Sequence, residues 1–371
     1  MKRFFSYTIL SFFLLLLPTG QASANNNDSI RLSLLTCAPG EEIYSLFGHT
    51  AIRYENSSQG IDVVFNYGLF SFNTPNFIFR FSLGETAYQL GATDYERFAA
   101  EYAFFGRSVW QQTLNLTDEE KTELIRLLQE NYRPENRVYR YNFFYDNCAT
   151  RPRDKIEESI AGKVIYPAEP QDGSLTFRDI VHQYCKGHPW ARFGIDLCIG
   201  SEADQPITQR QMMFAPFYLM DAFDGAQIKG DSIQRPLITA NELVVDATPE
   251  PDESDWMPTP LQCSLLLFIL TAAATIYGIR RRTGLWGIDL FLFGIAGIVG
   301  CVLAFLALFS QHPAVSSNFL LLVFHPGQLL FLPYIIYCVR KGKKCWYLTL
   351  NLAVLTLFIV LFPVIPQRFD F

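Results

Sequence analysis

Four long apolar stretches in the last third of the chain constrain its architecture more than any other feature. Each contains about 20 residues, the length that an α-helix needs to cross a hydrocarbon core of about 30 Å. Between residues 261 and 371 the only acidic residues are Asp289 and Asp370. The sequence therefore predicts a four-helix transmembrane domain over residues 261–371, with spans at Leu261–Ile279, Gly287–Phe309, Phe319–Val339 and Trp346–Pro366.

Two basic clusters orient the predicted helices. Arg280-Arg281-Arg282 follows the first span, and Arg340–Lys344 separates the third span from the fourth. Positively charged loops stay on the cytoplasmic side of a membrane. The loop at residues 310–318 and the C-terminus are therefore expected on the outer side, together with residues 25–260.

The N-terminus has the three parts of a secretory signal. Lys2 and Arg3 precede the apolar run Tyr7–Pro18, and Ala22-Ser23-Ala24 is a small-residue cleavage site. This pattern predicts a signal peptide over residues 1–24, with an uncleaved membrane anchor as the alternative. Residues 247–260 are rich in proline and acid, which predicts a linker. An extracytoplasmic domain then occupies residues 25–246.

The charge distribution excludes two classes of protein. The net charge is −6, yet residues 261–371 hold eight basic and only two acidic side chains, so the extracytoplasmic part is strongly acidic. An acidic domain joined to an apolar one makes nucleic acid an improbable partner and excludes a purely soluble enzyme. Intrinsic disorder is excluded as well, because 33 Phe and 18 Tyr residues supply ample material for a core.

Local patterns in the extracytoplasmic domain predict strands and then helices. Alternating or β-branched residues indicate strands at Arg31–Thr36, Thr50–Tyr54 and Ile61–Tyr67, and an aromatic run indicates an extended segment at Val138–Phe144. Thr117 and Glu120 form a capping-box pattern, which begins a helix that runs to about Asn131. Asp146 and Asn147 are candidate caps of a helix through Cys148 towards Ile160. This order is typical of an α+β fold.

Two segments carry residues suited to nucleophilic chemistry. His49 stands at the start of a predicted strand, and Cys148 stands at a predicted helix N-terminus. Free N–H groups at a helix N-terminus lower the pKa of a thiol and can face a developing oxyanion. A neutral histidine nearby would complete an activated cysteine nucleophile.

The amino-acid sequences of these segments resemble those of a known family. SLFGHTAIRY, FNYGLF, NLTDEE and NFFYDNCATRPRD resemble the periplasmic domain of Lnb-type bacterial lipoprotein N-acyltransferases. The resemblance covers most of residues 30–160 and is weaker from 161 to 245. The last 111 residues, including Gln311-His312-Pro313 and Asn318, resemble the membrane part of that family. This resemblance implies a permuted papain/NlpC-P60-like extracytoplasmic domain, in which the strand with the histidine precedes the helix with the cysteine. The four-helix transmembrane domain follows it.

The resemblance also implies an activity and a location. The expected enzyme moves an acyl chain from a phospholipid donor to the N-terminal amine of a diacylglyceryl lipoprotein. Its partners would be that donor, that acceptor and membrane lipid, and no cofactor or metal is expected. The chain would be a multi-pass protein of the bacterial inner (cytoplasmic) membrane with its catalytic domain in the periplasm.

Individual roles follow from matching positions. Cys148 would form the thioester, His49 would accept its proton, and Asn66 on the next strand would orient the imidazole. Asn66 ending its strand in a turn is the alternative. Tyr67 and Asp62 would stand behind Asn66. Candidate substrate-binding residues are Arg53, Arg151, Tyr67 and His312, with salt bridges as the alternative for both arginines.

Several further residues invite competing interpretations. Cys185 and Cys198 are 13 residues apart in an extracytoplasmic loop-rich stretch, which favours a disulfide over a zinc site with His182 and His188. Cys37 is then expected to be a buried free thiol. His325 and Pro326 interrupt the third span, so His325 is either functional or satisfies backbone groups that Pro326 leaves free.

Two other function classes stay open. The same Cys–His pair in a hydrolase would use water as the acceptor and cut peptidoglycan peptides or lipid esters, and the domain without activity would be a binding module. Four membrane helices favour substrates that are themselves in the membrane. The aromatic segment Phe70–Phe81 is either a lid that keeps water from a thioester, a lipid-facing edge, or ordinary core.

Overall fold

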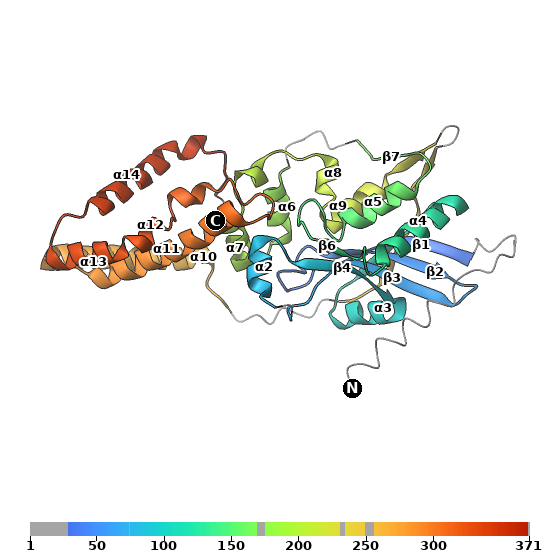
Figure 1. Ribbon diagram of the computed structural model, residues 1–371, viewed down its shortest axis with the longest axis horizontal. Helices are drawn as coiled ribbons and strands as arrows, with labels where there is room; N and C mark the ends of the chain where they lie inside the picture. The colour runs from blue at the N-terminus through green and yellow to red at the C-terminus, as the bar shows by residue number, and fades with distance from the viewer. Residues whose placement is uncertain (1–28, 74, 169–174, 231–233, 249–255, 370–371) are drawn as a thin grey trace.

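The structure, a computed structural model, describes residues 29–73, 75–168, 175–230, 234–248 and 256–369. The predicted signal peptide and most of the predicted linker lie outside the described residues. Figure 1 shows a sheet domain at one end of an elongated molecule and a group of long helices at the other. The sheet domain ends with a strand at Val245, and the first long helix begins at Pro260.

A seven-stranded antiparallel sheet is the centre of the first domain. In spatial order its strands are β10 (Ile238–Val245), β5 (Val109–Leu114), β1 (Ile30–Cys37), β2 (His49–Asn56), β3 (Ile61–Leu69), β4 (Ala87–Asp94) and β6 (Val138–Arg140). The three strands predicted from alternation are confirmed, each one to three residues longer at its ends. The predicted extended segment at residues 138–144 contributes only the short edge strand β6, because a turn bridged between Asn142 and Asp146 follows it.

Helices cover both faces of this sheet (Figure 1). On one face, α3 (Tyr95–Phe104) packs Phe98 against a small core that contains Leu35 and Val64. The other face carries α4 (Asp118–Tyr132), α5 (Thr150–Ser159) and α9 (Pro216–Asp224) over the largest core. Alternation along β1 explains the two cores, because Leu34 faces one side and Leu35 the other.

The predicted capping box at the start of α4 is confirmed. The Thr117 hydroxyl accepts a hydrogen bond from the Glu120 backbone N–H, and the Glu120 carboxylate accepts one from the Thr117 N–H at 2.8 Å. Glu120 is buried, and its carboxylate also accepts the Ala161 N–H and pairs with Arg235. One side chain therefore caps α4 and ties it to the chain that leaves α5.

A helical layer and a small second sheet complete the domain. The sheet is formed by β7 (Lys163–Ile165), β8 (Gln227–Lys229) and β9 (Gln234–Pro236), and the layer by α6 (Phe177–Tyr184), α7 (Pro189–Cys198), η2 (Ser201–Asp204) and α8 (Gln209–Met212). Arg178 organises this layer: its guanidinium is fully buried and contacts Asp196 at 2.6 Å and Asp204 at 2.7 Å. Phe177 and Phe47 belong to the apolar core that surrounds it.

The membrane part has three long apolar helices among the described residues, and a fourth span if a bent pair is counted as one. They are α10 (Pro260–Arg281), α11 (Trp286–Phe309), the pair formed by η3–α12 (Phe319–Leu322 and Gly327–Leu330) with α13 (Leu332–Lys341), and α14 with η4 (Trp346–Leu361 and Phe362–Val364). The chain therefore has the α+β domain followed by a transmembrane domain, as predicted.

The predicted interruption of the third span is confirmed. A non-helical stretch around Pro326 separates η3 from α12, and the half that ends at Leu330 is bent by 71° from the half that begins at Leu332. Pro326 has no N–H to continue a helix, and Gln328 donates a hydrogen bond to the Val323 carbonyl at 2.7 Å, so Gln328 satisfies a backbone group that the break leaves open. His325 lies 3.5 Å from Asn351 across the helix pair.

The two parts of the molecule are joined by several hydrogen bonds. The loop between α11 and η3 donates from Gln311 N–H to the Leu83 carbonyl at 3.0 Å and accepts from Ser201 N–H at Ser317, also at 3.0 Å. After α14, Gln367 donates to the Ile199 carbonyl at 3.2 Å, and Arg368 pairs with Asp179. The loop between α11 and η3 and the chain end are thus both attached to the sheet domain.

Candidate active site

His49 begins β2 after a sharp turn. Gly48 has a φ of +78°, and a Cβ atom there would lie 2.5 Å from the Cys37 carbonyl oxygen, so only glycine fits. The Nε2 atom of His49 lies 3.2 Å from Oδ1 of Asn66 on β3. Because an amide oxygen only accepts, Nε2 carries the proton and Nδ1 keeps a lone pair. The structure therefore brings together the predicted base and its predicted orienting residue.

Cys148 stands directly before α5. Asn147 fixes this position, since its Oδ1 atom accepts the Ala149 and Thr150 N–H groups at 2.8 and 2.9 Å. Its Nδ2 atom donates to the carbonyls of Phe143 and Phe214, both at 2.8 Å. The capping role predicted for Asn147 is confirmed. Asp146 does not cap the helix but pairs with Arg151 at 2.6 Å.

Three groups surround the Cys148 sulfur. The backbone N–H of Thr50 and the hydroxyl of Tyr141 donate hydrogen bonds to it. Gly68 lies alongside, and a Cβ atom there would be 3.6 Å from both Cβ of Cys148 and Cε2 of Tyr141. Thr50 follows His49 in the chain, so the thiol and the imidazole lie at the same end of β2, just past the Ala51–Asn66 pair that ends the β2–β3 ladder.

Both groups are neutral at rest. Burial lowers the pKa of His49 to about 4, although the Asn66 hydrogen bond acts in the opposite direction. Burial also raises the pKa of the Cys148 thiol, against the smaller effects of the Thr50 amide and the Tyr141 hydroxyl. The expectation of a lowered thiol pKa at the helix N-terminus is therefore wrong, because desolvation outweighs the surrounding donors. The site thus holds a neutral thiol and a neutral imidazole at the same end of β2, the two groups that a cysteine nucleophile and its base require.

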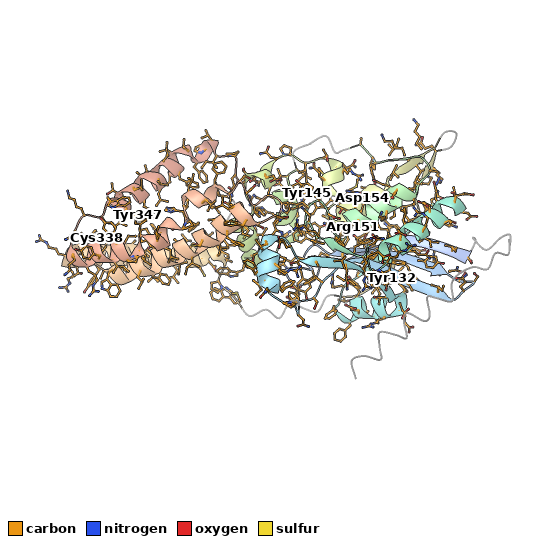
Figure 2. The ribbon with its side chains drawn as sticks, viewed as in Figure 1. Tyr132, Tyr145, Arg151, Asp154, Cys338 and Tyr347 are labelled. Carbon is orange, nitrogen blue, oxygen red and sulfur yellow. The ribbon has the colours of Figure 1, made fainter. Side chains whose placement is uncertain are left out.

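Both arginines follow the salt-bridge alternative. Arg53 is buried on the face of α3, where its guanidinium contacts Asp62 at 2.6 Å and lies 3.3 Å above the Tyr95 ring. Arg151 pairs with Asp146 and lies 3.5 Å above the Tyr139 ring. Figure 2 shows Arg151 on α5, together with Asp154. The fold thus uses the charge of Arg53 internally, and a phosphate-binding role for it is not supported.

The other two predicted contacts differ from expectation as well. Tyr67 is fully buried in the main core, and its hydroxyl donates to Asn131 at 2.8 Å, so its role is structural. Asp62 likewise stands with Arg53 and not behind Asn66. His312, in the outer loop, places Nε2 2.5 Å from the Phe81 carbonyl oxygen and its ring 5.2 Å from the Phe81 ring. It joins the membrane part to the helix α2 (Phe77–Leu83).

Sequence reasoning missed Tyr141, Thr50 and Gly68. Tyr141 lies immediately before the quoted segment NFFYDNCATRPRD, seven residues before the nucleophile, so its nearness was a usable signal. Thr50 contributes a backbone N–H, which no side-chain pattern reveals. The place of Gly68 in the site can be recognised only once the fold brings it next to Cys148.

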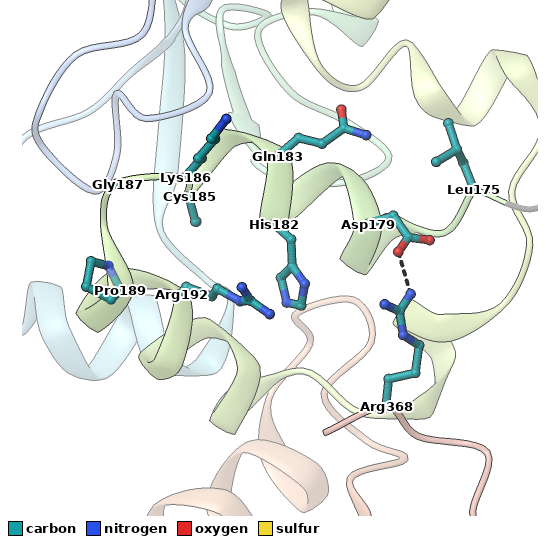
Figure 3. Close-up of a pocket in the computed structure, with 10 residues that line it drawn as sticks. All are labelled: Leu175, Asp179, His182, Gln183, Cys185, Lys186, Gly187, Pro189, Arg192 and Arg368. Carbon is teal, nitrogen blue, oxygen red and sulfur yellow. Dashed lines mark hydrogen bonds and ion pairs between the residues drawn. The ribbon is translucent and has the colours of Figure 1, made fainter. Parts of the chain in front are cut away.

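A polar pocket of about 580 Å³ lies between α6, α7 and the chain end (Figure 3). Asp179 and Arg368 pair across it, and His182 places Nε2 2.9 Å from the Asp196 carboxylate beneath it. Figure 3 shows His182 and Arg192 projecting towards the same space. Neither Cys148 nor His49 lines this pocket, so it is separate from the Cys–His pair.

The predicted disulfide in this region is wrong. Cys185 and Cys198 are both free thiols. Cys185 is the C-cap of α6, and Cys198 is the last residue of α7. Cys37 is a buried free thiol, as predicted, and burial raises its pKa to about 12.

Comparison with known families gives two matches that follow each other along the chain. Residues 20–182 match the Lnb N-terminal periplasmic domain, and residues 252–371 match the Lnb transmembrane domain. Comparison with curated proteins and with solved structures gave no match. The first match includes His49, Asn66 and Cys148.

Proposed function

Because the chain belongs to the Lnb family and acts in lipoprotein biosynthesis as a membrane protein with a periplasmic domain, we propose that it is a cysteine-dependent acyltransferase. The donor is a phospholipid, and the acceptor is the N-terminal amine of a diacylglyceryl lipoprotein. The enzyme sits in the inner membrane as a multi-pass protein. Both substrates are membrane lipids or carry them, which is why a site attached to membrane helices suits the reaction.

The single observation that carries this proposal is the arrangement of Asn66, His49 and Cys148. Asn66 holds the neutral imidazole at 3.2 Å with Nδ1 unprotonated. Cys148 stands at the same end of β2 with its sulfur against the Thr50 amide. A base, a nucleophile and an orienting group at one site are what acyl transfer through a covalent intermediate requires.

In the first half-reaction the Cys148 sulfur attacks the carbonyl carbon of a phospholipid ester. The carbon–sulfur bond forms, the carbon–oxygen ester bond breaks, and the thiol proton passes through His49 Nδ1 to the departing glycerol oxygen. A lysophospholipid leaves, and the acyl group remains as a thioester on Cys148.

In the second half-reaction the lipoprotein amine attacks the thioester carbonyl carbon. The carbon–nitrogen bond forms and the carbon–sulfur bond breaks, while one amine proton returns through His49 to the sulfur. The backbone N–H groups of Thr50 and Cys148 both point to the sulfur, so they are placed to face negative charge as it develops on the sulfur or the adjacent carbonyl oxygen.

Mass spectrometry of a lipoprotein N-terminal peptide tests this proposal. Cells that rely on the wild-type protein should yield an amine-acylated peptide, and Cys148→Ala should remove that one acyl chain at equal expression. Cys198→Ala is the matched control, because Cys198 is a free thiol on α7 away from His49. Persistence of the acyl chain with Cys148→Ala, in cells without another N-acylating enzyme, contradicts the proposal.

Purified full-length protein separates transfer from hydrolysis. With labelled phospholipid vesicles and a diacylglyceryl peptide, transfer gives labelled peptide. Release of labelled free fatty acid at the same rate with and without the peptide would identify water as the acceptor and favour a lipid esterase.

A further inference from the structure

The helix α2 presents exposed apolar side chains at the boundary between the two parts of the molecule. Ile78 is 79% exposed and Phe79 is 58% exposed, and α2 contains no buried residue. The Phe79 ring lies 6.0 Å from the ring of Phe305 on α11, one of the membrane helices. Figure 1 shows α2 at the end of the sheet domain that faces these helices. An apolar surface of the periplasmic domain is therefore continuous with a membrane helix.

A series of aromatic rings leads from α2 to the nucleophile. Phe81 stacks on Phe77 with 6.0 Å between ring centroids, and Phe77 stacks on Phe70 at 5.8 Å. Phe70 lies 5.2 Å from Tyr88, and Tyr88 stacks on Tyr141 at 4.4 Å. The Tyr141 hydroxyl donates a hydrogen bond to the Cys148 thiol. We call this set the aromatic strip: Phe79, Phe81, Phe77, Phe70, Tyr88 and Tyr141.

The membrane end of the aromatic strip is hollowed. A depression of about 390 Å³ is lined by Phe72, Asn76, Phe77, Ile78 and Phe79. Four of its five lining residues are apolar, and its size falls within the range of about 300–1,000 Å³ that small-molecule sites occupy. Exposed apolar patches bordered by polar surface are characteristic of interaction sites.

At the other end the aromatic strip reaches Tyr141, which lies next to Gly68 and Cys148. Gly68 has a φ of +92°, and any side chain there would stand between Cys148 and Tyr141. Tyr141 itself combines an apolar ring, which continues the strip, with a hydroxyl that holds the thiol. The strip therefore ends at the atom that forms the thioester.

We propose that the aromatic strip binds the acyl chain of a phospholipid and guides it from the outer surface of the bilayer to Cys148. This inference rests on the proposed acyl transfer through Cys148. The contact of Phe79 with Phe305 on α11 supplies the starting point in the membrane, and the successive ring contacts from Phe81 to Tyr141 supply apolar side chains along which methylene groups are removed from water. The strip thus determines that the enzyme uses long-chain donors.

Paired donors test the inference on full-length protein. The variant Ile78→Ser/Phe79→Ser alters two exposed side chains, so the fold tolerates it. Phe104→Ser is the matched control, because Phe104 is 79% exposed on α3, at the other face of the sheet. The readout is the rate of Cys148 acylation by intact mass, with no amine acceptor present. One donor is a 16-carbon phosphatidylethanolamine in vesicles, and the other is water-soluble p-nitrophenyl butyrate.

The double variant should lower the rate with the 16-carbon donor at least about tenfold, because two apolar contacts at the membrane end are lost. Its rate with butyrate should stay within about twofold of wild type, and Phe104→Ser should preserve both rates. An unchanged long-chain rate, or equal losses with both donors, would overturn the inference. Failure of wild-type Cys148 to become acylated by either donor would instead overturn the proposed function.

Discussion

The His49 imidazole meets the Asn66 side chain at the end of the β2–β3 ladder, with 3.2 Å between Nε2 and Oδ1, and the backbone partner of Asn66 is Ala51, two residues after His49. The contact fixes both the orientation and the tautomer of the imidazole. Nδ1 is consequently the nitrogen that is left to accept a proton. Since burial holds the pKa of His49 at about 4, this nitrogen is unprotonated at neutral pH without any help from an acidic neighbour.

Removing the Asn66 side chain should slow acylation while leaving donor binding in place. We expect Asn66→Ala to lower the rate of thioester formation by about 10²-fold, which is within the range that a positioned general base contributes. The KM for the donor should change little, because Asn66 contacts the imidazole. Asn131→Ala removes an amide that holds Tyr67 and not His49, and serves as control. A rate within twofold of wild type would show that Asn66 does not orient the base.

Alkylation should reveal a protonated resting thiol. Because the pKa of Cys148 is raised above its ordinary value, the thiolate is scarce at pH 7 and grows only as the pH increases beyond the ordinary thiol range. Iodoacetamide should modify Cys148 slowly at pH 7 and progressively faster above about pH 9. Peptide mass mapping gives the rate at this residue. Fast modification that is already constant near pH 6 would indicate a thiolate–imidazolium pair instead.

Replacing the buried arginine of the helical layer should lower the stability of the domain more than replacing an exposed arginine. Arg178 is fully buried between Asp196 and Asp204, so Arg178→Met leaves buried carboxylates without that cation. We expect the free energy of unfolding to fall by about 3–5 kcal/mol. Arg126→Met breaks an exposed pair with Glu123 and should leave the free energy of unfolding almost unchanged, because solvent screens such pairs. Denaturant titration in detergent compares the two, and equal losses would contradict the argument.

A side chain added at Gly84 should disrupt the junction between the sheet domain and the membrane part. Gly84 has a φ of +72°, and a Cβ atom there would lie 3.1 Å from backbone atoms of Gln311 and His312. Gly84→Val should therefore raise hydrogen exchange in residues 310–318. Gly60→Val is the control, since its φ is +63° and nothing lies within 4 Å of the added atom. The same increase in both variants would mean that backbone strain alone accounts for it.

Features encoded by neighbouring residues were predictable from the sequence. The Thr117–Glu120 capping box and the alternation in β1 to β3 act over a few residues, so local patterns sufficed. The pairing of Asn66 with His49 also follows locally, because adjacent antiparallel strands place nearby residues side by side.

Features that depend on tertiary placement were not predictable. The pKa of Cys148 depends on how deeply the sheet and α5 bury the thiol, which its position before a helix does not disclose. Cys185 and Cys198 are close in sequence, yet both are free thiols, Cys185 at the end of α6 and Cys198 at the end of α7. Pro326 marked an interruption of the third span, but the 71° bend between the half ending at Leu330 and the half beginning at Leu332 depends on how these halves pack, which hydropathy does not disclose.

The attachment of both the α11–η3 loop and the chain end to the periplasmic domain has a geometric consequence. Because the domain is held at two places, the nucleophile stays at a fixed height above the lipid surface. A lipoprotein that is anchored by its own acyl chains presents its amine at a height above the membrane that this anchor sets. The enzyme would then select acceptors whose amine lies at the same height as the nucleophile. The distance of the first residue from the bilayer would decide this selection, and the amino acids that follow it would not.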